Sequence, residues 1–308
     1  MFSALCGLSL LFAIHLPDNV VGGDWCIGGF ILTGLLMWLG AWRIRDEEIP
    51  RVAIMTSAFF VASQIHVPLP VGTAHLLLNG LLGVVLGPRA LLAIPLGLFL
   101  QMALFGHGGW TTLGVNSCIM SLPALLAWLL FRGLRATRWI NLEWLRASLV
   151  ALCAMSFLLS MVYSITTLVT NHVNTLDGLD LTWANLVTFH PGTLLAIGGC
   201  TGLAVWVERK MHQAREFSLG LFIGEVAVLA TVALNSLTLV LGGLQNYRSL
   251  ALLILVVHLP LAVIEGTILG FTVAFLARVK PEMIGWSLSE KNACSNEPWP
   301  VEAAAKEA

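Results

Sequence analysis

Long runs of apolar residues, separated by short polar segments, make up most of this 308-residue chain. A helix needs about 20 apolar residues to cross the roughly 30 Å hydrocarbon core of a bilayer. The pattern therefore predicts an all-α fold, a polytopic integral membrane helical bundle with about nine transmembrane segments. The predicted segments are residues 25–42, 52–65, 74–86, 90–104, 116–131, 147–169, 185–207, 217–240 and 249–277.

The segments 52–65 and 74–86 are too short to cross a bilayer by themselves. About 13 residues at 1.5 Å each give only about 20 Å of helix. The segment that joins them, from His66 to His75, contains two prolines and a glycine, and we expect it to dip into the membrane and line a pocket. The glycines at 106, 108 and 109 predict a second entering loop, so that short or re-entrant segments rich in His and Gly lie near the outer face.

Charge supports this topology. Of the residues, 57% are hydrophobic and 11% are charged, where an ordinary soluble domain has about 25% charged residues. This excludes a nucleic-acid partner and a large soluble domain. If Lys and Arg mark the cytoplasmic side, only Arg248 falls outside, and the predicted location is the cell (inner) membrane with a cytoplasmic C-terminus.

The chain divides into three parts. Residues 1–13 are a signal-like or removable N-terminal segment, because they are apolar and too short to span. Residues 14–281 form a single membrane domain. Residues 282–308 have no apolar periodicity and predict a disordered cytoplasmic tail.

Candidate chemistry gathers in the two irregular segments. They carry His66, His75, His107 and Asn116 close to glycines and prolines. Neutral imidazole binds Ni, Co, Cu or Zn well, and histidines kept in an apolar chain favour a metal-handling site. Packing or bracing of a loop is the alternative for each histidine. The six cysteines show no CxxC spacing and are interpreted as small buried hydrophobes.

Two other function classes stay open. An intramembrane metal-dependent enzyme would need a histidine and carboxylate motif, but HExxH is absent, and His258 and Glu265 are spaced for neither zinc nor a triad. They share a helix face, where they are structural or couple to a partner subunit. A capture subunit for an organic micronutrient would instead need an apolar or aromatic pocket.

Several segments together resemble a known family. They are His15-Leu-Pro-Asp18, Val67-Pro-Leu-Pro-Val-Gly-Thr-Ala-His75, Leu86-Gly-Pro88, Gln101 through Phe105-Gly-His-Gly-Gly-Trp-Thr-Thr-Leu-Gly-Val-Asn116 with Met120, His258-Leu-Pro-Leu-Ala-Val-Ile-Glu-Gly266 and Arg278-Val-Lys-Pro-Glu282. The chain resembles the CbiM/NikM substrate-capture subunits of energy-coupling-factor transporters for cobalt and nickel. Residues 140–250 match less well and are expected to carry additional helices.

The resemblance implies high-affinity capture and translocation of Co²⁺ or Ni²⁺, with cobalamin biosynthesis as one destination and with no permanent cofactor. It implies as partners a coupling membrane subunit, ATPase subunits and a small accessory membrane subunit. No GxxxxGK[ST] phosphate loop occurs in the chain, so ATP hydrolysis would come from those partners, and the chain is a transporter subunit rather than an enzyme.

The resemblance also implies a ligand set near the outer face. In the family, the ion is held by the amino-terminal amine, by the next backbone nitrogen and side chain of a histidine at position two, and by a second histidine. His15 and His75 match the two histidines, and His107 and Asn116 match an outer loop that would orient the ligands. His15 is not at position two here. We therefore expect removal of residues 1–13, or a start at codon 14, to leave Ile14 at the terminus; without it, His66 or His107 would complete the site.

Overall fold

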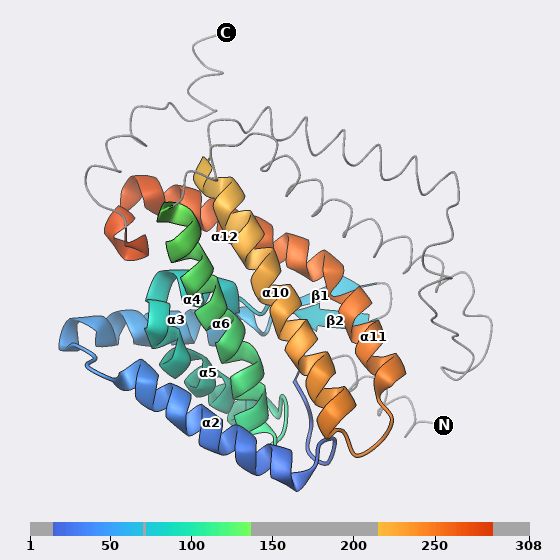
Figure 1. Ribbon diagram of the computed structural model, residues 1–308. Coiled ribbons are helices and arrows are strands. Elements are labelled where there is room, and N and C mark those ends of the chain that lie inside the picture. The colour runs from blue at the N-terminus through green and yellow to red at the C-terminus, as the bar shows by residue number, and fades with distance from the viewer. Residues whose placement is uncertain (1–14, 70–71, 137–214, 286–308) are drawn as a thin grey trace, which may run out of the picture.

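The computed structural model describes residues 15–69, 72–136 and 215–285 of the chain. This part is a bundle of helices with one small hairpin (Figure 1). Its helices are α2 (Gly23–Ala41), α3 (Ile49–Ala62), α4 (Asn79–Leu86), α5 (Ala90–Phe105), α6 (Leu113–Ala136), α10 (Arg215–Gly242), α11 (Arg248–Val257) and α12 (Leu259–Val279). The 3₁₀ turns are η1 (Asp46–Glu48), η2 (Gly87–Arg89) and η5 (Pro281–Ile284), and the strands are β1 (His66–Leu69) and β2 (Gly72–His75).

Glycines let α10 and α12 pack closely against each other. Gly220 and Gly224 on α10 face Gly270 and Gly266 on α12, four residues apart on each helix. A Cβ added at Gly224 would lie only 2.7 Å from Gly266 Cα, so only glycine allows this approach. Helices in membranes associate through such small-residue faces, since lipid removes the hydrophobic driving force between them.

Five candidate spans occur among the described residues: Gly23–Ala41, Asn79–Phe105, Leu113–Arg135, Glu216–Gly242 and Leu261–Val279. They confirm a helical, multi-pass membrane protein. The predicted segments 147–169 and 185–207 lie outside the described residues. The candidate span Asn79–Phe105 contains both α4 and α5, with the η2 turn between them.

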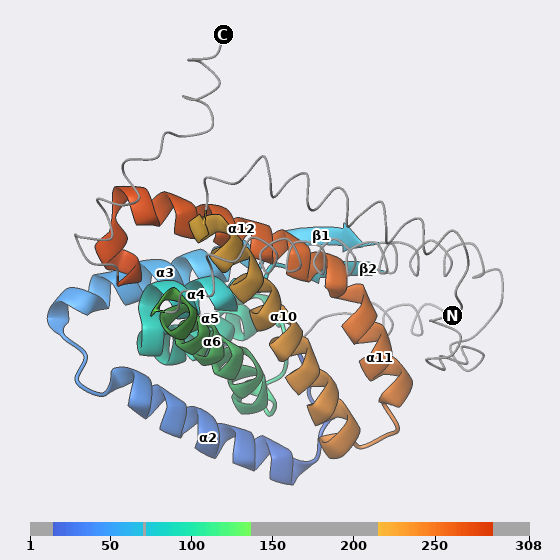
Figure 2. The same cartoon turned by 45° about the horizontal axis from the view of Figure 1, so that its top comes forward.

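The outward side of α2 consists of large apolar side chains. Ile27, Ile31, Leu35 and Trp38 are all at least half exposed, and they recur at helical spacing. Figure 2 shows α2 along one edge of the bundle. In a membrane protein such a surface contacts the acyl chains of lipid.

Three local predictions need correction. Residues 74–78 are not helical: the hairpin pairs His66 with His75, and α4 begins only at Asn79. The apolar run 249–277 is divided at His258, where α11 ends and Pro260 occupies the first turn of α12. The predicted tail begins too early at 282, because η5 continues to Ile284, whose side chain is buried.

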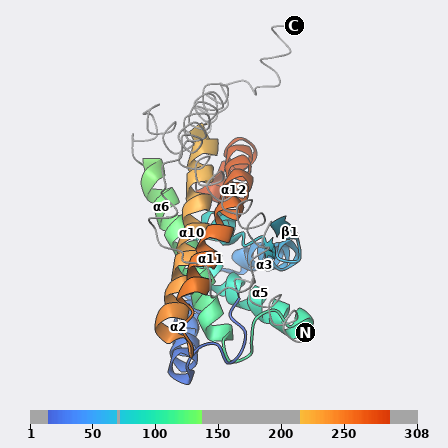
Figure 3. The same cartoon turned by 90° about the vertical axis from the view of Figure 1, so that its right-hand side faces the viewer.

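The hairpin lies to one side of the bundle. Figure 3 shows β1 and α3 on the opposite side of α10 from α6. The prolines and glycine between His66 and His75 explain why the chain turns back there instead of continuing as a helix.

Candidate metal site

The segment that follows residue 14 is fixed to the first turns of α6. The Asn116 side chain pairs with the backbone of Leu16 in both directions: Oδ1 accepts from the Leu16 N–H at 2.9 Å, and Nδ2 donates to the Leu16 carbonyl at 3.0 Å. The Thr112 hydroxyl donates to the same carbonyl at 2.6 Å. Buried backbone groups must find partners, and these three bonds fix the position of the residue next to His15.

A second anchor joins this segment to the glycine-rich loop between α5 and α6. The Asp18 carboxylate accepts the backbone N–H groups of Trp110 and Thr111, at 3.1 and 2.8 Å. Gly108 has a φ of +85°, a conformation that suits glycine. A Cβ at that position would lie 3.2 Å from Asn116 Nδ2 and 3.5 Å from His15 Cβ. The loop therefore closes tightly over the histidine.

His15 and His75 lie face to face. Their ring centroids are 4.8 Å apart with an interplanar angle of 20°, and the two residues are only 4% and 6% exposed. His75 Nδ1 lies 3.2 Å from the carbonyl oxygen of Leu76. Two imidazoles that are 60 residues apart in sequence thus meet in one buried position.

The chain after His75 is held by a carboxylate from the other end of the protein. Glu265 on α12 accepts the backbone N–H groups of Leu77 and Leu78, the second at 2.9 Å. Leu78 has a φ of +46°, an uncommon conformation for a branched residue, so the turn needs outside support. Glu265 provides that support, and α4 begins directly afterwards.

Electrostatics keep the His15 imidazole neutral. Burial, followed by the nearby His75 and His107, lowers the pKa of His15 well below its usual value, while the Gln101 side chain acts in the opposite direction. Gln101 is 1% exposed. Neither its amide nor His15 Nε2 reaches a partner at ordinary hydrogen-bond geometry among the described residues. Buried polar atoms normally have hydrogen-bond partners, so the unpaired Gln101 amide and His15 Nε2 are consistent with a site for a ligand.

The other predicted residues are placed as follows. His107 is close enough to affect the pKa of His15, and its ring centroid is 6.2 Å from that of Phe105. The hairpin register puts His66 opposite His75. Ile14 lies outside the described residues. Within the described part, no group of three or more His, Cys, Asp or Glu side chains is arranged to hold a metal, so the histidine pair would need other nitrogen or oxygen donors.

Comparison with known families identifies the family of this chain. The family described as the cobalt uptake substrate-specific transmembrane region, CbiM, matches residues 15–207 and 191–283. The chain belongs to the CbiM family. Its matched region starts at His15, the first residue of the histidine pair.

Individual relatives of this CbiM-family chain differ in coverage. A protein of Haemophilus influenzae named for metal transport is 39% identical over 120 residues, which cover 39% of this chain and 58% of that protein. A protein of Methanocorpusculum labreanum named for cobalt transport is 26% identical over 280 residues, covering 88% and 92%. A solved structure of a transition metal transporter covers 92% of this chain and all of its own, with 17% identity and a TM-score of 0.47.

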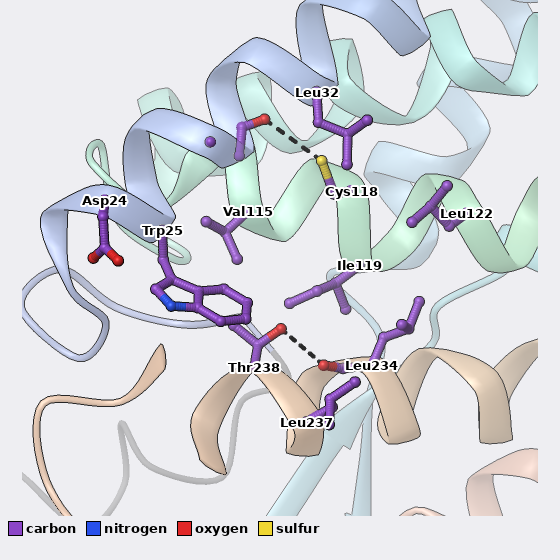
Figure 4. Close-up of a pocket in the computed structure, with 12 residues that line it drawn as sticks. Asp24, Trp25, Leu32, Val115, Cys118, Ile119, Leu122, Leu234, Leu237 and Thr238 are labelled. Carbon is purple, nitrogen blue, oxygen red and sulfur yellow. Dashed lines mark hydrogen bonds between the residues drawn. The ribbon is translucent and has the colours of Figure 1, made fainter. Parts of the chain in front are cut away.

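A separate cavity of the CbiM-family chain has different chemistry. It has a volume of about 430 Å³ and lies between α2, α6 and α10, with the Trp25 indole directed into it (Figure 4). Cys118 Sγ bonds to the Gly29 carbonyl at 3.5 Å, and the Thr238 hydroxyl bonds to the Leu234 carbonyl at 2.8 Å. Since its walls are mostly apolar and Asp24 is the single carboxylate among the lining residues, this cavity suits hydrocarbon rather than a metal ion.

His258 and Glu265 are buried within the chain itself. They are 2% and 4% exposed, and His258 Nδ1 lies 2.7 Å from the Ile254 carbonyl oxygen. This favours the structural alternative for both residues over contact with a partner subunit. Sequence reasoning gave no role to Gln101, Asp18 or Thr112, although all three fall within the segments that carry the family resemblance.

Proposed function

We propose that this protein captures Co²⁺ or Ni²⁺ and carries it across the membrane, as the substrate-binding subunit of an ATP-driven energy-coupling-factor transporter. The observation that carries the proposal is the buried, stacked pair of His15 and His75. Imidazole is a preferred donor for these ions, and burial removes competing water. The cobalt and nickel names of the relatives agree with this substrate class.

In the proposed site, the imidazoles of His15 and His75 bind the ion together with the amine of Ile14 and the backbone nitrogen of His15. Removal of residues 1–13, or a start at codon 14, would supply that amine. An all-nitrogen set suits Ni²⁺ and Co²⁺ and disfavours Mg²⁺ and Ca²⁺, which prefer oxygen donors. Gln101, Asn116 and His107 orient the ligands, and Asn116 does so through the backbone of Leu16.

The proposed topology keeps the finer features expected from the sequence. About nine segments cross the cell (inner) membrane, the C-terminus is cytoplasmic, and the hairpin from His66 to His75 enters the membrane from the outer face. Irregular backbone is tolerated at that depth only where protein or a hydrated cavity surrounds it. The two Glu265 bonds at Leu77 and Leu78 are consistent with this requirement.

The energy for transport would come from other subunits. The sequence has no phosphate-binding loop of its own, so a coupling membrane subunit and ATPase subunits would complete the transporter, with a small accessory membrane subunit beside them. The printed names of some relatives describe fused nickel transport proteins, which supports an assembly of several transport components.

Uptake of radioactive nickel tests this proposal. The chain is expressed in cells that lack other nickel and cobalt uptake, either alone or with the coupling and ATPase subunits. We expect nickel to accumulate only in cells that have the complete set of subunits, and this accumulation to be lost in His75→Ala. The control His172→Ala removes a histidine that is not a proposed ligand and should behave as wild type. Nickel uptake that is unchanged in His75→Ala would contradict the proposal.

Protein purified from the same cells distinguishes the other function classes. A subunit for an organic micronutrient would use the apolar cavity beside Trp25, and its ligand would copurify with the protein while metal would not. An intramembrane enzyme would act without ATPase subunits. Retained nickel or cobalt at one ion per chain would exclude the organic alternative.

A further inference from the structure

A second, positively charged cavity lies where α4, α6 and η5 meet. Its volume is about 350 Å³, and its lining includes the three arginines Arg51, Arg132 and Arg135. Glu282 is the single carboxylate in that lining. Three guanidinium groups and one carboxylate leave the cavity with an excess of positive charge.

In the described part of the chain, carboxylates balance the arginine charges only in part: Glu282 lines the cavity and Glu48 acts on Arg51 through charge, but neither forms a salt bridge with the three arginines. The salt bridge seen there joins Arg89 to Glu48 at 3.1 Å, and it involves none of the three arginines of this cavity. Arg51 donates to the carbonyls of Val85 and Met283, and Arg135 to those of Ile284, at 3.1 Å, and Gly285. These neutral carbonyls hold η5 in place but leave the net charge unchanged.

Arg132 is the arginine best placed to bind something else. It is exposed, and its contact within the described chain is with the Trp128 ring, whose centroid lies 5.7 Å from the guanidinium carbon. A guanidinium has five N–H donors in a planar fork, which matches the oxygens of a phosphate group. The ring contact leaves that fork available.

The cavity lies at the ends of two candidate spans, the position where lipid headgroups are expected. The candidate spans Leu113–Arg135 and Leu261–Val279 both end beside it. Figures 1 and 2 show the C-terminal end of α6 close to η5. Leu126 and Leu129 are exposed on α6 within two turns of Arg132, so an apolar surface for acyl chains continues from the cavity into the bilayer.

We propose that this cavity binds the phosphate of an anionic phospholipid headgroup. Arg132 and Arg135 would contact the phosphate oxygens, and the acyl chains would lie along the exposed leucines of α6. Basic pockets between transmembrane helices bind anionic headgroups in this way, and bidentate arginine contacts to phosphate are strong. Because an acyl surface adjoins the cavity, a lipid fits better than dissolved phosphate. The inference is independent of the proposed metal transport.

Native mass spectrometry of the full chain in mild detergent tests the inference. The protein is mixed with equal amounts of phosphatidylglycerol and phosphatidylcholine, and retained lipid is counted in wild type, Arg132→Gln and Arg43→Gln. Arg43 is exposed, lies after α2 and does not line the cavity, so it is a matched control for charge. We expect wild type and Arg43→Gln to prefer phosphatidylglycerol and Arg132→Gln to lose about fivefold of that preference.

Four results would overturn the assignment. Equal retention of the two lipids would exclude an anionic lipid site. An equal loss in Arg132→Gln and Arg43→Gln would indicate general surface charge rather than this cavity. Displacement of the lipid by millimolar inorganic phosphate would assign the cavity to a dissolved anion. Unchanged lipid binding in Arg132→Gln, together with lost assembly of the transporter, would assign it to an acidic segment of a partner protein.

Discussion

At the scale of single residues, His15 combines burial with readiness to bind a metal. Its depressed pKa keeps the ring neutral, which is the form that coordinates an ion, and the cause is first burial and then the neighbouring imidazoles of His75 and His107. The protein thus holds two imidazoles together without having to bury two positive charges.

This arrangement predicts a pH dependence of stability in metal-free protein. An unfolded histidine has a pKa of about 6.5, so below that pH the unfolded chain takes up a proton. Folded His15 does not take up this proton, because its pKa is lowered. The His15 contribution to stability is therefore complete above about pH 6.5 and is lost as the pH falls towards the folded pKa. Thermal unfolding at about pH 7.5 and about pH 5.5 measures it.

The matched variants for this measurement are His15→Gln and His172→Ala. We expect Tm to fall more steeply with acid in wild type and His172→Ala than in His15→Gln. Parallel curves for all three proteins would contradict the role of His15 burial.

Alanine substitutions at two glycines of the loop after α5 distinguish the effect of backbone strain from the effect of contact with the site. Gly106 and Gly108 both have positive φ, +67° and +85°, but only Gly108 lies near Asn116 and His15. We expect alanine at either position to destabilise the protein by about 1 kcal/mol. Nickel affinity, measured by titration calorimetry, should fall only in Gly108→Ala. Equal affinities for the two variants would show that the loop does not shape the site.

Sequence reasoning worked well for residue types and less well for residue neighbours. His66, His75, His107 and Asn116 stood out because imidazole and amide groups are costly in an apolar chain, whereas His15 became a candidate only through the family resemblance. Gln101 did not stand out, because its importance depends on facing His15 across two separate segments, and sequence spacing carries no information about that distance.

At the scale of elements, the central feature is the link between α12 and the strand that carries His75. Glu265 connects the last described long helix to the start of α4 through two backbone hydrogen bonds. A change in the position of α12 would therefore reach the proposed metal-binding segment directly, without passing through the rest of the bundle.

Replacing Glu265 with glutamine tests this link. The amide keeps one acceptor oxygen but presents an NH₂ group to the second N–H, so one buried donor loses its partner at a cost of about 1–3 kcal/mol. We expect nickel affinity to fall by about 10-fold to 100-fold, as when a ligand-orienting residue is lost. Glu282→Gln, which changes an exposed carboxylate, should bind nickel normally.

A purely structural role for Glu265 gives a different result. In that case Tm would fall in Glu265→Gln while the nickel affinity of the remaining folded protein stayed at the wild-type value.

Most helices could be predicted from apolar run length, but their interruptions could not. The segments 90–104, 116–131 and 217–240 match α5, α6 and α10 closely. The predicted run 74–86 took in the last two residues of β2, because the apolar residues continue from the strand into α4 and only pairing with β1 marks the strand. The break at His258 was hidden for the same reason, since the apolar residues continue on both sides.

At the scale of the whole molecule, the basic and histidine-bearing regions lie in different places. The histidine pair lies before α2 and at the end of β2, whereas Arg51, Arg132 and Arg135 gather near η5 and the C-terminal end of α6. This separation agrees with the proposed orientation, in which the ion is received on one face and the basic residues lie on the cytoplasmic face.

Reporter fusions test the orientation. Alkaline phosphatase is active only outside the cytoplasm, whereas green fluorescent protein attached after Ala308 fluoresces only inside it. We expect fluorescence for the C-terminal fusion and phosphatase activity for a fusion after Asn246, in the loop between α10 and α11. The opposite pattern at both positions would invert the proposed topology.

The central claim, that His15 and His75 hold a transported nickel or cobalt ion, is tested most directly by metal content and intact mass on one purified sample. Wild type, His75→Ala and His172→Ala are exposed to equimolar nickel and cobalt, and loosely bound ions are removed. The account predicts one retained ion per chain on a protein that begins at Ile14, with the ion lost only in His75→Ala. Folded wild-type protein that retains no ion, or a His75→Ala variant that retains as much as wild type, would contradict it.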